Sequence, residues 1–209
     1  MIQNRVNPFG DIIYTPARGT WLGNRGQLHG KGKAILVPFK HKAWIICVLK
    51  FKGRRRDIMS PGLWTELFFL DEATALAAGH RPCFECRRED AKRFKVAWLE
   101  GNPTYGFNQK TSISKIDEVL QEERIKVGHK KVTFKSDLNE LPNGTFITIR
   151  RKAYLLVDQL MYLWSPFGYG KGAAIALSTT VDVLTPRSIV NALKAGYSPH
   201  ILLKPENFL

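Results

Sequence analysis

The feature that most constrains the fold of this chain is a pair of cysteines, Cys83 and Cys86, placed directly after a helical pattern that ends at Gly79. A proline precedes the pair and two arginines follow it. Two thiolates at this C-x-x-C spacing can reach one tetrahedral metal ion, because a tight turn between them points both sulfurs inward. The spacing therefore predicts a metal-binding turn with a basic rim. A thioredoxin-like redox pair is disfavoured, because Cys83 does not follow a strand and open a helix in a β-α-β pattern.

The third thiol of the chain, Cys47, lies 36 residues upstream of Cys83 in an apolar segment. Three thiolates and one nitrogen or oxygen ligand would complete a tetrahedral Zn²⁺ site. We favour His29 as the fourth ligand, because its segment could pair with the strand that carries Cys47. A buried core thiol is an equally open interpretation of Cys47. The other candidates for the fourth ligand are His41, His80 and Asp57.

Positive charge is the outstanding property of the composition. The chain has 209 residues and a formal net charge of +14, and residues 1–60 hold twelve lysines and arginines but only two acidic residues. Such an excess attracts polyanions, nucleic acid more often than anionic membrane. A DNA or RNA backbone is therefore the expected partner, although solvated charges that only keep the chain dispersed are the alternative. The side chains expected to bind it are Lys52, Arg54, Arg55, Arg56, Arg87, Arg88 and Lys92.

The cellular compartment is predicted from what the sequence lacks. Three cysteines are too few for a disulfide scaffold, and the N-terminus shows no apolar secretion signal. No apolar run approaches the roughly 18 residues of a membrane span. We therefore expect a cytoplasmic protein without a membrane partner, whose thiols stay reduced and free to bind metal.

The pattern of the whole chain predicts an α+β fold in three parts. Residues 1–30 are loop-rich, residues 31–100 form a metal-binding module of short antiparallel strands and helices, and residues 101–209 form a small β-rich subdomain with a terminal helix. The expected helices are 64–78, 88–99, 113–127 and a last one with Thr185 as its N-cap, Pro186 at its first position and Gly196 at its end. The expected strands are 34–39, 43–51, 132–134, 145–149, 154–157 and 180–183.

Residues 64–90 resemble the zinc-binding, methylphosphotriester-repair domain of the Ada DNA-repair family. The shared features are Phe68-Phe69, the alanine-rich segment that follows, and Arg-Pro-Cys-x-x-Cys-Arg over residues 81–87. The resemblance implies an Ada-like module in which Cys83 and Cys86 are the downstream zinc ligands, and which docks on the DNA backbone. It makes Cys47 the only counterpart of an upstream ligand. The family's upstream pair is Cys-x-x-x-Cys, whereas here Val48-Leu49-Lys50-Phe51 follows Cys47 and a fourth cysteine is absent.

Three functions are consistent with these patterns. The first is a zinc-binding, nucleic-acid-binding protein of DNA repair, modification or defence. The second is a zinc-dependent enzyme, either a nuclease or a transferase acting on DNA or RNA, in which Cys47 would be the nucleophile of a methyl transfer. The third is a metal-stabilised scaffold that binds protein and whose charge is incidental.

Overall fold

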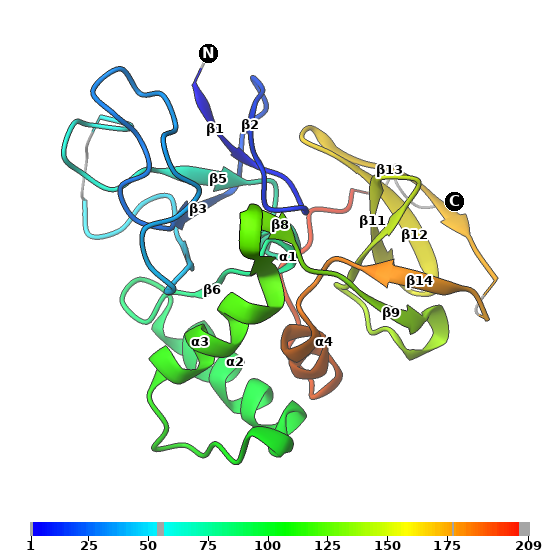
Figure 1. Cartoon of the computed structure of the whole chain (residues 1–209). Coiled ribbons are helices and arrows are strands. Elements are labelled where there is room, and N and C mark those ends of the chain that lie inside the picture. The colour runs from blue at the N-terminus through cyan, green and yellow to red at the C-terminus, as the bar shows by residue number, and fades with distance from the viewer. Residues whose placement is uncertain (1, 54–56, 177, 205–209) are drawn as a thin grey trace.

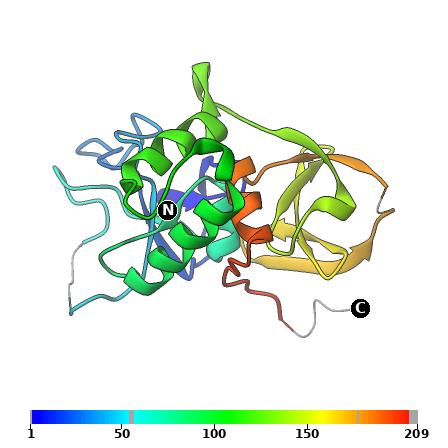
Figure 2. The same ribbon diagram turned by 90° about the horizontal axis from the view of Figure 1, so that it is seen from below.

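A computed structural model of the chain describes residues 2–53, 57–176 and 178–204 (Figure 1). The described residues form two six-stranded sheets and a layer of helices, which confirms the α+β class. Figures 1 and 2 show one sheet with α2 and α3 on one side of the molecule, the second sheet on the other side, and α4 between them. The helices are α1 (Glu72–Ala77), α2 (Arg88–Gly101), α3 (Ile113–Arg124) and α4 (Arg187–Lys194).

The N-terminal sheet is mixed and has the strand order β2-β1-β5-β3-β4-β6. Strands β1 and β5 pair in parallel, as do β4 and β6, while the other neighbours are antiparallel. Its strands are short, with two to four residues each. They are β1 (Gln3–Val6), β2 (Ile12–Tyr14), β3 (Trp21–Asn24), β4 (Ile45–Cys47), β5 (Leu67–Phe69) and β6 (Arg81–Pro82).

The C-terminal sheet is antiparallel throughout, with the order β13-β12-β11-β10-β14-β9. Its strands are β9 (Phe134–Asp137), β10 (Phe146–Ile149), β11 (Lys152–Val157), β12 (Leu160–Ser165), β13 (Gly168–Ala174) and β14 (Thr180–Val183). A small ladder of β7 (Ile125–Lys126) and β8 (Lys130–Lys131) links α3 to this sheet. The three short 3-10 helices are Pro103–Tyr105, Val127–His129 and Leu138–Glu140. The β-rich character expected for the second half of the chain is therefore present.

One apolar cluster joins distant parts of the sequence. It is built around Phe69, Trp98 and Leu120, and it runs from Val6 near the N-terminus to Tyr197 after α4. All three predicted parts of the chain contribute side chains to this cluster. The division at residues 30 and 100 stays a prediction.

Three expectations for the N-terminal half are wrong. The strands of the predicted module are not all antiparallel, because β4 and β6 pair in parallel. Only the second half of the helix expected over 64–78 is helical, as α1, and its first half contains strand β5. Leu67 and Phe69 are buried while Phe68 between them is half-buried, which is the alternation of a strand. The strand expected over 34–39 is a loop that makes a single bridge, His29 to Ile35.

The start of α4 also differs from its prediction. Pro186 is the N-cap residue, and the Thr185 hydroxyl accepts a hydrogen bond from the backbone N–H of Phe146 (2.9 Å) instead of capping the helix. The carboxylate of Glu123, on α3, accepts the backbone N–H of Ser188 (3.0 Å) in the first turn of α4. The end of α3 therefore caps α4. None of the described helices has the length and apolarity needed to cross a membrane.

Candidate metal centre

The parallel pairing of β4 with β6 brings Cys47 beside Cys83. Ile46 is the partner of Pro82 in this ladder, and each strand continues by one residue to its cysteine. The backbone N–H of Cys83 donates to the carbonyl of Ile46 (3.0 Å), which fixes the register. Two thiols that lie 36 residues apart in the sequence therefore emerge at the same end of two neighbouring strands.

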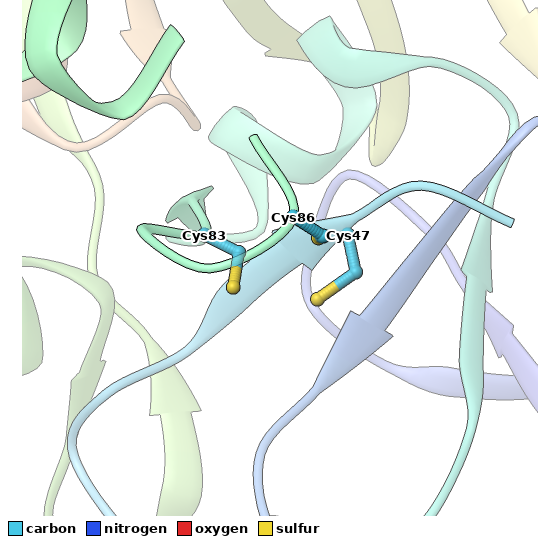
Figure 3. Close-up of side chains that lie close together, drawn as sticks. All are labelled: Cys47, Cys83 and Cys86. Carbon is cyan, nitrogen blue, oxygen red and sulfur yellow. The ribbon is translucent and has the colours of Figure 1, made fainter. Parts of the chain in front are cut away.

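A tight turn adds the third sulfur. The backbone N–H of Glu85 donates to Cys83 Sγ (3.3 Å), and the backbone N–H of Arg87 donates to the Cys83 carbonyl (3.0 Å). These bonds fold the chain back on itself, so that Cys86 faces the other two cysteines (Figure 3). The three Sγ atoms all lie within 4.8 Å of one another. An N–H group aimed at sulfur favours the thiolate, which is the form that binds metal.

The donor set suits a thiophilic metal ion. Zinc–sulfur bonds of about 2.3 Å in a tetrahedron place two sulfurs about 3.8 Å apart, which is compatible with three Sγ atoms that all lie within 4.8 Å of one another. Cys83 is buried, while Cys47 and Cys86 are partly exposed. The three cysteines can therefore hold a metal ion.

The three thiols interact electrostatically as one group. Hydrogen bonding from Cys47 is the main cause that lowers the pKa of Cys83, and Cys86 adds to it. The same contacts, together with burial, raise the pKa of Cys47. The cluster thus favours a first thiolate at Cys83, and a cation is required before the other thiols lose their protons.

The structure does not bring His29 to the sulfurs. Its Nδ1 lies 2.6 Å from the Thr65 hydroxyl and its Nε2 lies 3.2 Å from the Ser60 carbonyl oxygen, so both ring nitrogens have partners. Among the described His, Cys, Asp and Glu residues, the metal-compatible group contains Cys47, Cys83 and Cys86 alone. The expectation that His29 is a ligand is corrected accordingly.

The remaining candidates for a fourth ligand lie elsewhere as well. His80 is fully buried, and its Nε2 accepts from Arg25 Nε (3.2 Å) while its ring packs against Trp44 and Phe69. Burial and the nearby arginine charges lower the pKa of His80 well below its ordinary value, so the ring is neutral. His41 and Asp57 are exposed and do not belong to the group of metal-compatible residues in the described chain.

The predicted nucleic-acid-binding side chains have different environments. Lys52, Arg88 and Lys92 are exposed, and Lys92 pairs with Glu89 (2.9 Å). Arg54, Arg55 and Arg56 lie outside the described residues. Arg88 begins α2 two residues after Cys86, and Lys92 follows one turn later, so these two cations lie close to the metal-binding turn in the chain.

Arg87 is buried, which corrects its expected role as a phosphate contact. Only 3% of its side chain is exposed, and it forms ion pairs with Glu72 (2.9 Å) and Asp90 (2.8 Å). Its guanidinium group also lies 4.0 Å from the ring centre of Trp21. Arg87 therefore anchors the metal-binding turn to α1, α2 and β3. Sequence reasoning missed Glu72, because its pairing with Arg87 depends on tertiary packing between residues far apart in the chain.

We compared the chain with models of protein families, with curated proteins and with solved structures, and none of them matches it.

Proposed function

We propose that this chain is a zinc-binding protein that holds a nucleic-acid backbone on its positive surface, in DNA repair, modification or defence. The observation that carries the proposal is the cluster of three sulfurs within 4.8 Å of one another. The net charge of +14 and the resemblance of residues 64–90 to the Ada zinc domain add to it. Zinc is the ion of choice because a site of three thiolates suits it better than it suits calcium or magnesium.

Zinc would have a structural role at this position. Cys47, Cys83 and Cys86 would hold the ion and so cross-link the end of β4 to the turn that precedes α2. Arg88 and Lys92 extend from the same turn into solvent. Phosphate contacts by such side chains would depend on charge and would weaken as salt is added.

Elemental analysis of the purified full chain tests the metal site. We expect one equivalent of zinc in the wild type and its loss in Cys83→Ser and Cys86→Ser. Cobalt substitution adds a second readout, because sulfur-to-cobalt charge-transfer bands report thiolate ligands and should weaken in Cys47→Ser. His29→Gln is the matched control and should keep a full equivalent of metal. A folded wild type that binds neither zinc nor cobalt contradicts the proposal.

Fluorescence anisotropy of a labelled DNA duplex tests the partner. We expect affinity to fall steeply between 50 and 200 mM salt, with a slope of log K against log salt of roughly −0.9 for each phosphate contacted. The double variant Arg88→Gln, Lys92→Gln should bind more weakly and reduce that slope. Lys152→Gln, Lys171→Gln removes the same charge from the exposed C-terminal sheet and should bind like the wild type. Zinc binding without duplex binding would favour the protein-binding scaffold instead.

The partial exposure of Cys47 favours a zinc-dependent transferase as the second candidate. Cys47 is partly exposed at the end of β4, as a residue that meets a substrate must be. Bound zinc would supply a deprotonated thiolate at neutral pH. The Cys47 sulfur would then bond to the methyl carbon of a methylated phosphate, while the carbon–oxygen bond breaks and the phosphodiester leaves as an anion. Mass spectrometry of the chain after incubation with methylated DNA tests this step, which predicts a gain of one methyl group on Cys47.

A further inference from the structure

A second site lies at the opposite end of strand β4. A cavity of about 400 Å³ opens between the β1–β2 loop, residues 35–38 and the C-terminal end of α3. Trp44, which precedes β4, lines its floor, whereas Cys47 ends the strand. Three residues of extended chain separate the two positions by roughly 10 Å. The cavity is therefore distinct from the metal-binding turn.

Two buried arginines line this cavity next to Trp44. Arg25 is 1% exposed and Arg124 is 2% exposed. Their guanidinium carbons lie 3.9 and 4.0 Å from the ring centre of Trp44. Arg25 donates to His80 Nε2 (3.2 Å) and to the carbonyl of Gly10 (3.0 Å). These contacts fix the planes of the guanidinium groups without neutralising their charge.

Each arginine keeps a buried donor without a partner. Among the described residues, none accepts a hydrogen bond from Arg25 Nη2 or from Arg124 Nε. Arg25 Nη2 lies near Gly10, and both residues line the cavity. Buried donors are almost always satisfied in folded proteins, so each of these two groups calls for an acceptor, either an ordered water or a ligand.

The charges around the cavity are unbalanced. Lys131 also lines it and donates to the Ala77 carbonyl, so three cations share the site. Asp11, at the exposed edge, is the only carboxylate among the lining residues, while Asp117 near Arg124 already pairs with Arg81 (2.7 Å). His129 lines the exposed side, and His80 beneath is neutral. The described groups leave an excess of about two positive charges.

Burial and repulsion from neighbouring cations lower the pKa values in this cluster. Burial, together with the charges of Arg25 and Arg124, lowers the pKa of Lys131 to about 7. Burial also lowers the pKa of both arginines. A bound anion would stabilise the charged forms of these side chains and would therefore raise their pKa values again.

We propose that this cavity binds a phosphate monoester. A monoester carries close to two negative charges above pH 7, which matches the excess of the site when Lys131 is protonated, whereas a carboxylate carries one. Arginine guanidinium groups recognise phosphate oxygens, and both Arg25 and Arg124 line this cavity together with Lys131. Ile12, Ile35, Leu36 and Val37 form an apolar wall beside the cations, suited to the organic part of the ester. A nucleoside 5′-monophosphate and the phosphorylated end of a nucleic acid both present this group.

Isothermal titration calorimetry of the full chain tests the proposal, independently of the zinc and duplex experiments. We expect saturable binding of thymidine 5′-monophosphate with one site per chain, weaker binding of inorganic phosphate, and none of thymidine. Lys131→Met should weaken binding about tenfold, since it removes one charge-assisted bond. Lys130→Met, its exposed neighbour on β8, is the matched control and should bind like the wild type.

A second pair of variants keeps the test valid if the core substitution disturbs folding. Leu36→Glu places a negative charge at the mouth of the cavity on a side chain that is 69% exposed, and should weaken binding at least about fivefold by charge repulsion. Leu63→Glu, 46% exposed and not part of the cavity wall, is its control. Tighter binding of a 5′-phosphorylated than of a 5′-hydroxyl oligonucleotide would identify a strand end as the source. No binding of any phosphate at millimolar concentration, or equal binding of acetate, would overturn the proposal.

Discussion

Two consecutive buried carboxylates join the two sheets of the molecule. Asp71 caps α1 by accepting the backbone N–H of Thr74 (2.8 Å), and it also accepts the Tyr169 hydroxyl on β13 (2.7 Å) and the backbone N–H of Leu202 (3.0 Å). Glu72 accepts the Tyr197 hydroxyl (2.6 Å) and pairs with Arg87. Because unsatisfied partners would remain buried, each carboxylate has a large effect on stability.

Replacing Asp71 should therefore cost more than the loss of a helix cap. Asp71→Ala removes a cap worth about 1 kcal/mol and leaves two buried donors without acceptors, so we expect a total loss of about 3 kcal/mol. Urea unfolding followed by circular dichroism measures it. Ser112→Ala, which removes the exposed cap of α3, is the control and should cost only about 1 kcal/mol. Equal losses in the two variants would show that the contacts of Asp71 with β13 and the C-terminal segment contribute nothing.

At the scale of elements, α2 and α4 cross at a glycine. A Cβ on Gly101, the last residue of α2, would lie 2.3 Å from the carbonyl oxygen of Asn191 in α4. Backbone cannot move aside as a flexible side chain can. The closeness of the two helices therefore requires glycine at this position.

Gly101→Ala should force α2 and α4 apart. We expect a loss of about 1–3 kcal/mol in the free energy of unfolding, as for other overpacked contacts. Gly32→Ala is the matched control, because an added Cβ there meets no atom within 4 Å, and it should change stability by less than about 0.5 kcal/mol. Chemical denaturation of both variants measures the difference, and a neutral Gly101→Ala would contradict the close approach.

The cap that α3 provides for α4 should depend on pH. Burial raises the pKa of Glu123 in the folded state, partly opposed by the hydrogen bonds from Ser188. For an acid with a raised folded pKa, stability is lost as pH rises from the unfolded pKa, near 4.3, through the folded one. Relative to Glu123→Gln, the wild type should therefore be less stable at pH 8 than at pH 4. Unfolding free energies at both pH values measure this, and Glu122→Gln, at an exposed position, should track the wild type.

Local periodicity was sufficient to predict α2 and α3, because each has an apolar face that recurs at helical spacing. It failed over 64–71, where a short apolar run is compatible with a strand or a helix and only the pairing of β5 with β1 and β3 decides. The Cys83–Cys86 turn was readable from spacing alone. Spacing alone could not predict that Cys47 lies beside this turn, because that position depends on the parallel pairing of β4 with β6, two segments far apart in the sequence.

At the scale of the whole molecule, the same long-range packing should make unfolding cooperative. The apolar cluster around Phe69 and Trp98 includes Ile189 and Leu193 of α4, which follows the C-terminal sheet in the chain. Neither half of the chain can complete this core alone. The buried cations of the anion cavity were equally hidden from sequence reasoning, since Arg25, Arg124 and Lys131 share no motif.

We expect a single unfolding transition, in which tryptophan fluorescence and far-ultraviolet circular dichroism give coincident curves. Removing metal with a chelator should lower the midpoint of both curves together, because the ion would stabilise only the folded state. Cys83→Ser should show the lower midpoint without a further effect of chelator. Two separated transitions would instead indicate that the sheets unfold as independent units.

Strand β4 has three residues, yet the sites proposed at its two ends both depend on its alignment with β6. A slip of one residue would turn the buried Ile46 to the opposite face of the sheet and carry Cys47 away from Cys83. It would also displace Trp44 from beneath the two arginines. A substitution that shifts the pairing of β4 with β6 should therefore abolish both metal binding and anion binding, although the two sites share no atom.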